Sequence, residues 1–320
     1  MTEPWADRAF LRGAQYKTDA NLAARQSIYA YQHPRIDLAA RVLDLAAPAP
    51  SAAIVDVGCG NGAYLAELSK RGLAGRVIGI DLSPGMLAAA RDRVSGPGAP
   101  NGALAAGPGD PAAGPADPDA RPAEPAAGPA DPAVRPDAPD APDAGPDVPA
   151  VSRPLAVALA CADATALPLR DGVADLALAP HMLYHVPDPA DALRELRRVT
   201  RPGGRVVIVL NGAGHLRELR AAVAAARGSD PVAMGERVTL DDGEALARSF
   251  FPQVTRHDFV AELRVPGPGP IVDYVRSMSG TSHHADPDRV AQTVAAAFPR
   301  TSDGHYAITS HSGCLICQVG

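Results

Sequence analysis

VDVGCGNGAYL, residues 55–65, is the segment from which the fold can be predicted. An apolar strand ends at Asp56, a turn containing Gly58, Gly60 and Gly62 follows, and then a helix begins. Glycine permits positive φ and a close approach between backbone and ligand. The helix presents free N–H groups and the positive end of its dipole to the turn. We therefore expect a ligand to lie against this turn.

The glycine turn alone does not identify the ligand. Gly58, Gly60 and Ala63 also match G-x-G-x-x-G/A, the dinucleotide fingerprint of dehydrogenases. Asp81 closes the next apolar run, RVIGID (76–81), 23 residues after Gly58. A carboxylate there can accept hydrogen bonds from both hydroxyl groups of a ribose, whichever cofactor carries it.

Outward from this turn, short apolar runs alternate with amphipathic stretches, which predicts parallel strands joined by crossover helices. The expected strands are AAIVDVG (52–58), RVIGID (76–81), PLAVALAC (154–161), ADLALAP (174–180) and GRVVIVL (204–210). Ser83-Pro84 and Asp188-Pro189 each provide a capping side chain followed by proline, so we expect helices through Val94 and Val199. Pro202-Gly203-Gly204 is expected to stop the second helix. The predicted fold class is α/β, a doubly wound Rossmann-like fold with a mainly parallel sheet.

Further elements are predicted on both sides of this core. Residues 14–47 are expected to form two helices, the second starting near Pro34, within an N-terminal helical lid segment, residues 1–50. The main domain then covers residues 51–320. Strand-like runs at 254–265 and 306–319 enclose helical patterns at 271–278 and 286–298, which we expect to be added lid helices at about 266–303.

Residues 96–150 interrupt the domain with a Pro/Ala/Asp-rich insertion. It holds 15 of the 33 prolines and no aromatic residue, so it buries too little apolar surface to fold and is predicted to be disordered. Nine acids and two arginines give it a net charge of −7, which leaves +1 for the other 265 residues. A neutral body argues against a nucleic-acid partner. The insertion is interpreted either as a tolerated surface expansion or as a partner-recruiting arm.

The chain shows no run of about 18 apolar residues and no apolar or basic leader, so we expect no membrane partner and a cytoplasmic location. Four cysteines are too few for a disulfide framework. Cys314 and Cys317 are expected on opposite faces of a strand, as core residues rather than a zinc or redox pair.

Three further features separate the two cofactor readings. Asp56 lies inside the first strand, where dehydrogenases usually have an apolar residue. The segment CADATALPL (161–169) places Asp163 just after the third strand. The segment RVTRPGGRVVIV (198–209) leads into the fifth strand. Together with the glycine turn they resemble the class I S-adenosylmethionine-dependent methyltransferases over about residues 51–95 and 155–211. The resemblance implies that the cofactor is S-adenosylmethionine.

The resemblance also implies roles for individual residues. Asp56, Gly58, Gly60 and Gly62 would surround the amino-acid end of S-adenosylmethionine, with Asp81 on the ribose hydroxyls. Asp163 and the Ala164 backbone would meet the adenine edge, and Leu82 and Met86 would flank the ring. The alternatives are that Asp56 caps local backbone and that Asp163 is only a turn residue.

Two further segments resemble stand-alone methyltransferases of small molecules. In such enzymes the segment that corresponds to APHMLYHVPDP (179–189) lies between cofactor and acceptor. Their entry segment resembles QYKTDANLAAR (15–25), and this resemblance implies that Tyr16 reaches toward the cofactor. Methyl transfer is an in-line displacement, and an acceptor hydroxyl or amine must lose a proton. The candidate catalytic residues are His181, Tyr184 and His185. The two histidines would share a face of a helix beside Tyr184, and either could be the base. Alternatively, His181 positions the cofactor and His185 packs against the next turn. No metal is expected.

The sequence therefore predicts an S-adenosylmethionine-dependent methyltransferase acting on a small-molecule acceptor of the secondary-metabolite or modified-peptide class. An NAD(P)-dependent oxidoreductase and a non-catalytic cofactor-binding scaffold are the alternatives.

Overall fold

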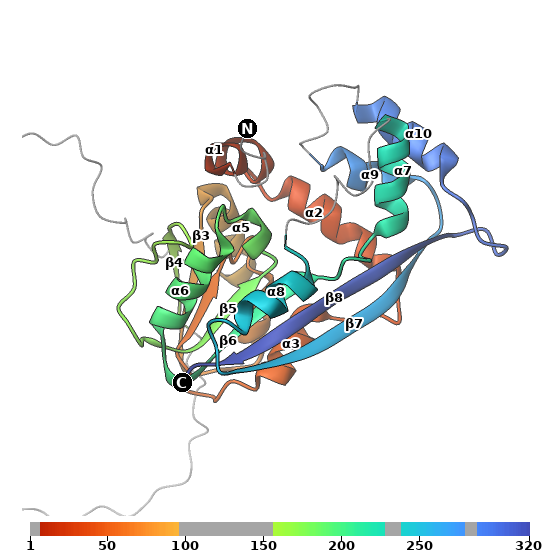
Figure 1. Cartoon of the computed structure of the whole chain (residues 1–320). Helices are drawn as coiled ribbons and strands as arrows, with labels where there is room; N and C mark the ends of the chain where they lie inside the picture. Colours follow the sequence, from red (N-terminus) through yellow and green to blue (C-terminus); the bar gives the residue numbers. More distant parts are fainter. Residues whose placement is uncertain (1–6, 96–155, 228–237, 279–286) are drawn as a thin grey trace, which may run out of the picture. The chain divides into compact units, whose positions relative to one another are not determined.

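The computed structural model describes residues 7–95, 156–227, 238–278 and 287–320. The predicted disordered insertion, residues 96–150, lies outside the described residues. Within the described part, eight strands form one sheet in the order β1-β7-β8-β6-β5-β2-β3-β4 (Figure 1).

Five adjacent strands of this sheet are parallel. They are β2 (Ile54–Val57), β3 (Arg76–Asp81), β4 (Ala156–Cys161), β5 (Ala174–Pro180) and β6 (Thr200–Asn211). The other strands, β1 (Gln32–His33), β7 (Gln253–Val265) and β8 (Tyr306–Gln318), pair antiparallel. The predicted α/β class with a mainly parallel sheet is confirmed.

Both faces of the parallel strands are covered, which explains their unbroken apolar sequences. Alternation along β2 directs Ile54 to one core and Val55 and Val57 to the other. The core of Ile54 contains side chains of α3 (Leu38–Ala46), α4 (Ala63–Lys70) and α5 (Pro84–Ser95). The opposite core contains side chains of α6 (Pro189–Val199) and α8 (Leu240–Ala247). The sheet is therefore doubly wound, as predicted.

The predicted capping signals mark real helix starts. Asp188 Oδ1 accepts a hydrogen bond of 2.9 Å from the Ala190 N–H, and Pro189 occupies the first turn of α6. Ser83 Oγ accepts a hydrogen bond of 3.3 Å from the Met86 N–H at the start of α5. The short side-chain acceptors satisfy backbone N–H groups that the helices leave unpaired.

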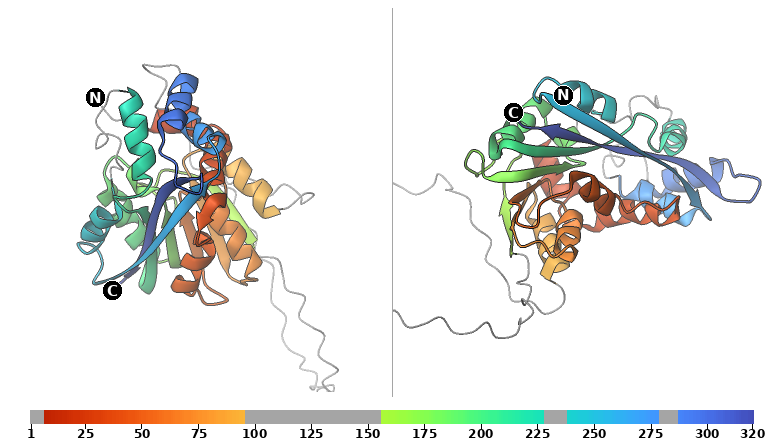
Figure 2. Two further views of the ribbon diagram at one scale, coloured as in Figure 1. Left: turned by 90° about the vertical axis from the view of Figure 1, so that its right-hand side faces the viewer. Right: turned by 90° about the horizontal axis from the view of Figure 1, so that it is seen from below.

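A long antiparallel pair of strands extends the sheet beyond the parallel strands (Figures 1 and 2), and we call this pair the hairpin although helices connect its two strands in the chain. Its strands, β7 and β8, have 13 residues each. Their far ends pack with α7 (Arg217–Arg227), α9 (Gly269–Arg276), α10 (Pro287–Ala297) and the 3-10 helix η3 (Ile28–Tyr31) into a third core. The sequence did not predict α7 or α8.

The N-terminal segment differs from its prediction. It contains α1 (Arg8–Phe10), the π-helix η2 (Leu11–Gln15) and α2 (Ala20–Ser27), but the next helix, α3, begins at Leu38 rather than near Pro34. Its start is fixed by Asp37, whose side chain accepts a hydrogen bond from the Ala40 N–H. The residues before it instead form β1, which pairs Gln32 with Leu263 of β7.

The stop signal after α6 also acts differently from the expectation. The helix ends at Val199, and β6 is already paired with β5 at Thr200. Pro202-Gly203-Gly204 lies where the register between these strands shifts, so it forms an irregularity within the strand rather than the end of the helix.

Cys314 and Cys317 are fully buried in β8 and belong to opposite cores. A separation of three residues places them on opposite faces of the strand, as predicted. The two thiols cannot form one two-sulfur site in this arrangement, so they act as core side chains.

Candidate active site

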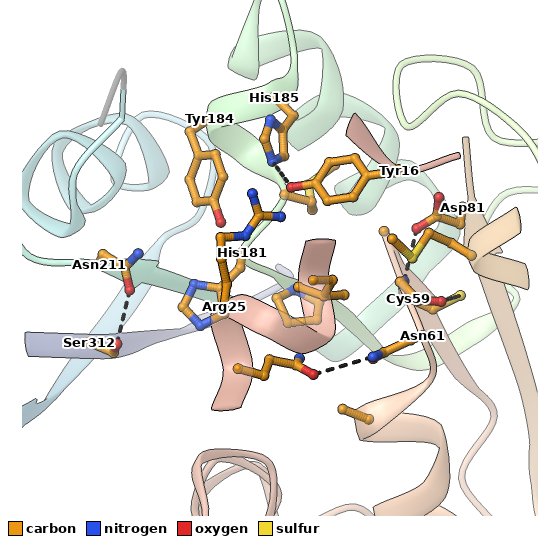
Figure 3. A pocket seen from close by; sticks show the side chains of 18 of the residues that line it. Tyr16, Arg25, Cys59, Asn61, Asp81, His181, Tyr184, His185, Asn211 and Ser312 are labelled. Carbon is orange, nitrogen blue, oxygen red and sulfur yellow. Dashed lines mark hydrogen bonds between the residues drawn. The ribbon is translucent and has the colours of Figure 1, made fainter. Parts of the chain in front are cut away.

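A cavity of about 1100 Å³ lies at the carboxyl ends of the parallel strands. Its lining includes Gly58 after β2, Asp81 at the end of β3, His181 after β5 and Asn211 at the end of β6. Ligands of open α/β sheets bind at this edge. Asn211 and Ser312 lie opposite Asp81 and Cys59, with Arg25 and Tyr184 between them (Figure 3).

The glycine turn has the left-handed backbone that its sequence predicts, with φ of +71° at Gly58, +54° at Gly60 and +78° at Gly62. A Cβ on Gly58 would lie 2.6 Å from the Met182 Cβ, so a side chain cannot be accommodated there. Gly58 and Gly60 line the cavity. Gly62 is instead packed against Ala90 of α5, where an added Cβ would be 3.0 Å from its Cα, and it is absent from the cavity lining.

Asp81 faces the cavity with its carboxylate held in place. Its Oδ2 accepts a hydrogen bond of 2.9 Å from the Gly60 N–H, and its Oδ1 accepts one of 2.8 Å from the Ser83 N–H. Burial raises the pKa of Asp81, against the opposing effect of these backbone donors. A carboxylate has lone pairs for about four hydrogen bonds, so it can accept more than these two.

Asp56 is fully buried and does not line the cavity. Neither carboxylate oxygen has a hydrogen-bond partner, so Asp56 does not cap local backbone. Desolvation, followed by the charge of Asp81, raises the pKa of Asp56 to about 8. The structure thus places this acid behind the glycine turn rather than at the cavity surface.

The four residues that were predicted to contact the adenine all line the cavity: Leu82, Met86, Asp163 and Ala164. Asp163 Oδ1 accepts hydrogen bonds from the Thr165 N–H at 2.9 Å and from Thr165 Oγ at 2.8 Å. Its other oxygen forms an ion pair with Arg8 of α1. Asp163 therefore stabilises the turn after β4 and also anchors the N-terminal segment, while it still lines the cavity.

Tyr16 connects the N-terminal segment to both sides of the cavity. Ser83 Oγ donates a hydrogen bond of 2.6 Å to the Tyr16 carbonyl, next to the start of α5. At the other end of the residue, Tyr16 Oη lies 2.8 Å from His185 Nε2, and the two rings meet edge to face. The structure therefore brings Tyr16 to the predicted histidine segment (Figure 3).

His181, Tyr184 and His185 all line the cavity, but they do not share a helix face. His181 precedes the 3-10 helix η4 (Leu183–His185) and has a left-handed backbone, with φ of +53°. Such strain in a non-glycine residue is stored most often at functional sites. Burial lowers the pKa of His181 to about 4, so its imidazole is neutral near pH 7.

Several cavity residues were missed by the sequence analysis. Tyr29 Oη lies 2.8 Å from His215 Nε2, and Ser312 Oγ donates a hydrogen bond of 2.9 Å to Asn211 Oδ1. Arg25 lies over the Tyr16 ring, 5.4 Å from its centroid. The signal for two of them was present, because NGAGH (211–215) follows the carboxyl end of a parallel strand.

Among the described residues, no group of three or more His, Cys, Asp or Glu side chains is arranged to hold a metal ion. In the same part of the chain, every helix is too short or too polar to cross a bilayer.

Comparison with known proteins gives a consistent family. Residues 31–250, more than half of the chain, match a methyltransferase domain family. Malonyl-[acyl-carrier protein] O-methyltransferase of Serratia marcescens is 24% identical over 252 residues, which cover 76% of this chain and 69% of that protein. A 37.1 kDa uncharacterized protein in transposon TN4556 of Streptomyces fradiae is 32% identical over 168 residues, covering 52% of this chain but only 32% of that protein.

Two solved structures share the fold. A Bacillus halodurans C-125 protein assigned as a methyltransferase has a TM-score of 0.52 at 16% identity, covering 88% of this chain and 98% of its own. Haemonchus contortus phosphoethanolamine N-methyltransferase 2, solved with phosphomonomethylethanolamine and S-adenosylhomocysteine, has the same TM-score at 16% identity, covering 100% of this chain and 61% of its own.

The residues present fit the cofactor of this family. The turn at Gly58 and Gly60 carries no side chain that would keep a ligand from the backbone, and the fixed carboxylate of Asp81 faces the same cavity with lone pairs left to accept hydrogen bonds. The family match resolves the ambiguity of the glycine turn against the oxidoreductase. The chain belongs to the methyltransferase domain family and is a class I methyltransferase that uses S-adenosylmethionine.

Proposed function

We propose that the protein transfers the methyl group of S-adenosylmethionine to a small-molecule acceptor by in-line displacement inside the cavity described above. One observation carries this proposal: a single cavity joins the glycine turn and Asp81 to the His181–His185 segment and continues to Asn211 and Ser312. Both reactants can therefore meet in one space.

The volume supports two reactants. Pockets for one drug-sized ligand measure about 300–1000 Å³. The cavity has about 1100 Å³ and reaches from the cofactor side to the hairpin of β7 and β8. That span leaves room for an acceptor beside the cofactor.

When bound, the cofactor supplies an electrophilic methyl group on a positively charged sulfur. In this proposal Gly58 and Gly60 let the backbone approach its amino-acid end, and Asp81 accepts hydrogen bonds from its ribose. Leu82 and Met86 enclose the adenine ring, while Ala164 and Asp163 lie at its edge. Asp56 lies behind the turn, within β2, and does not touch the cofactor directly in this proposal. Aligning the acceptor and excluding water provide most of the catalysis.

We assign the removal of an acceptor proton to His185. His181 is a poor base, because its pKa of about 4 leaves little tendency to hold a proton at pH 7. His185 Nε2 shares a hydrogen bond with Tyr16 Oη at the cavity surface, and Tyr184 packs against the same imidazole, with ring centroids 4.5 Å apart. A proton taken from the acceptor would rest on this imidazole. His181 would then orient the bound molecules.

The N-terminal segment and α9 with α10 act as the lid in this proposal. Arg8 binds Asp163 and Ser83 binds the Tyr16 carbonyl, so the first helices are fastened beside the adenine side of the cavity. Water exclusion follows if these contacts persist when cofactor is bound. Nucleic acid and membrane are not partners in this proposal, and the cytoplasm remains the predicted location.

Calorimetry with S-adenosylhomocysteine tests the cofactor assignment. Asp81→Asn removes a charged acceptor, so we expect its affinity to fall about 10- to 100-fold. Asp92→Asn, on the exposed side of α5, is the matched control and should bind like the unchanged protein. Equal affinities for all three proteins would overturn the ribose assignment. A turnover assay with labelled methyl donor then separates an enzyme from a scaffold.

A further inference from the structure

The cavity wall at the start of α7 carries a charged residue that the proposed methyl transfer does not use. Four residues with helical spacing line the cavity here, and they are Leu216, Leu219, Arg220 and Val223. Positions separated by three, four and seven residues share one face of a helix. The three leucine and valine side chains are buried, so Arg220 interrupts an apolar face. In Figure 1, α7 and β3, whose end carries Asp81, lie on opposite sides of α2.

Arg220 is partly buried, yet within the described part of the chain no carboxylate forms an ion pair with it. Its guanidinium donates one hydrogen bond, to the neutral carbonyl oxygen of Ala213. Three other partly buried arginines are each paired with two or three carboxylates: Arg71, Arg198 and Arg256. A charge removed from water without an opposite charge is unfavourable. Since a guanidinium has five N–H donors, Arg220 keeps both its charge and donors for a ligand.

The loop before α7 fixes the position of this guanidinium. The Leu216 N–H donates a hydrogen bond of 2.8 Å to the Thr309 carbonyl of β8, and Leu216 has φ of +51°, which non-glycine residues rarely adopt. The Arg220 N–H donates a hydrogen bond of 2.9 Å to the Leu216 carbonyl. Because Ala213 of the same loop accepts a hydrogen bond from the guanidinium, both ends of Arg220 are held by this loop. A side chain that is held before binding loses less conformational entropy when a ligand arrives.

His215 lies in the same loop but does not add a second positive charge. Both of its ring nitrogens have partners within the protein, because the His311 N–H donates a hydrogen bond of 3.1 Å to Nδ1 and Tyr29 Oη lies 2.8 Å from Nε2. We call Tyr29, His215 and His311 the polar cluster around His215. Burial, followed by the charges of His181 and Arg220, lowers the pKa of His215 to about 3, so its imidazole is neutral at pH 7. Arg220 thus supplies positive charge to this wall, whereas the imidazole does not.

The acidic side chains near this wall are engaged elsewhere. Glu218 precedes Arg220 by two positions, but its carboxylate accepts hydrogen bonds from the Thr309 N–H at 2.9 Å and from Thr309 Oγ at 2.7 Å. Glu218 also does not line the cavity. Among the described residues, the acids that line the cavity belong to other elements, and they are Asp37 before α3, Asp81 in β3 and Asp163 after β4. A carboxylate of a ligand would therefore meet Arg220 without a competing acid from α7.

We propose that Arg220 anchors a carboxylate of the methyl acceptor, and that the apolar face of α7 beside it contacts the hydrocarbon part of the same molecule. The inference rests on the proposed methyl transfer and names the acceptor class as an apolar carboxylic acid. Guanidinium and carboxylate pair through two parallel hydrogen bonds. A single guanidinium balances the one charge of a carboxylate, whereas a phosphate with two charges would keep one of them unbalanced against an apolar wall.

The sodium salt of 2-naphthoic acid and the neutral 2-naphthamide are suitable probes, because they share one shape and differ in charge. Their binding is measured by calorimetry, with and without saturating S-adenosylhomocysteine. We expect 2-naphthoate to bind more tightly than 2-naphthamide. Arg220→Gln removes the charge but keeps an N–H donor, so it should weaken 2-naphthoate binding about 10- to 100-fold and change 2-naphthamide binding less than about twofold. Arg220→Lys retains the charge without the planar fork and should keep part of the preference.

Arg217→Gln is the matched control, since Arg217 belongs to the same helix and does not line the cavity. This variant should bind both probes like the unchanged protein. Absence of 2-naphthoate binding, equal affinities for the two probes, or an unchanged 2-naphthoate affinity in Arg220→Gln would each overturn the inference. Tighter binding of 2-naphthylphosphonate than of 2-naphthoate would overturn the assignment to a carboxylate. If S-adenosylhomocysteine itself fails to bind the unchanged protein, the proposed function fails instead, whatever the probes show.

Discussion

Asp56 places a carboxyl group in the core without a hydrogen-bond partner for either oxygen. A buried, unpaired carboxylate is so unfavourable that the group takes up a proton instead. This explains why burial is the first cause of its pKa of about 8, against 3.8 for an ordinary aspartate. The free energy of unfolding must then depend on pH, because the unfolded chain releases this proton at a much lower pH.

The direction of this dependence is fixed. Between the unfolded and folded pKa values, the folded chain holds one more proton, so stability falls as pH rises toward 8. The pKa values of His181 and His215 are lowered from 6.5, so these two groups make the stability rise with pH instead. Their effect is confined to pH values below 6.5. From pH 6.5 to 8, we expect Asp56 to contribute a loss of about 1.4 kcal/mol per pH unit. Urea unfolding of Asp56→Asn should lack this contribution, whereas Asp92→Asn should retain it. Parallel curves for all three proteins would contradict the prediction.

His185 and His181 are distinguished by turnover rather than by binding. His185→Ala should lower the rate about 10²- to 10⁴-fold for an acceptor that must lose a proton, while S-adenosylhomocysteine affinity is retained. His257→Ala, on β7 and outside the cavity lining, is the control and should keep the rate. Undiminished turnover of His185→Ala with an unchanged pH profile would remove this residue as the base.

Single residues were predictable where a motif gave their position. Gly58, Asp81, Tyr16 and His185 were singled out from the sequence, and the structure brings them to one cavity. The pair of Tyr29 and His215 could not be found in this way, because 186 positions separate two residues that meet only in the folded domain. Asp56 was expected near the ligand, but sequence gives no measure of burial depth.

At the scale of elements, the N-terminal segment packs closely on the start of α5. A Cβ on Gly85 would lie 2.0 Å from the Lys17 carbonyl oxygen. Gly85→Ala should therefore push the segment away, at a cost of about 1–3 kcal/mol, and weaken the contact of Ser83 with Tyr16. We expect faster proteolysis near residues 7–19 and weaker S-adenosylhomocysteine binding. Gly13→Ala, which has open space around the new methyl group, should show neither effect. Unchanged proteolysis in Gly85→Ala would contradict this packing.

Strand β8 makes a separate prediction about thiol chemistry. Cys314 and Cys317 are fully buried, and desolvation raises the pKa of each to about 12, which suppresses the reactive thiolate. Cys59 is also buried, and only Cys161 is exposed among the four. An aromatic disulfide reagent should modify Cys161 first in native protein and the other three after unfolding, as mass spectrometry can show. Rapid native labelling of Cys314 would contradict the assignment to the core.

The elements differ in how far local sequence determines them. α5 and α6 carry their own start signals, and their boundaries were predictable from capping side chains. β1 has two residues and no pattern of its own, since it is a strand only because it pairs with β7. Pro34 follows β1 directly, and it was wrongly interpreted as a helix start because this strand pairing is not visible in the local sequence. A local signal cannot reveal a pairing made with residues more than two hundred positions away.

At the scale of the whole domain, different parts of the sheet form different parts of the cavity. The parallel strands end at the cofactor side of the cavity, and the hairpin of β7 and β8 carries the third core beyond them. The polar cluster around His215 lies where these two parts meet. The part of the cavity around the glycine turn could thus be inferred from a family motif, whereas the polar cluster around His215 depends on long-range packing that no short segment encodes.

The Pro/Ala/Asp-rich insertion can be tested against this division. It connects α5, which ends at Ser95, to β4, which begins at Ala156. Replacing the insertion by a Gly/Ser linker of about ten residues should keep S-adenosylhomocysteine affinity within about twofold. Stability should rise by about 1–1.5 kcal/mol, because a shorter loop costs less entropy to close. A scrambled insertion of the same composition is the control for length and charge. Loss of S-adenosylhomocysteine binding would contradict the interpretation as a tolerated surface expansion. A partner-recruiting arm would be supported by a different result, in which binding is retained but turnover is lost. In that case the natural insertion should restore turnover and the scrambled insertion should not.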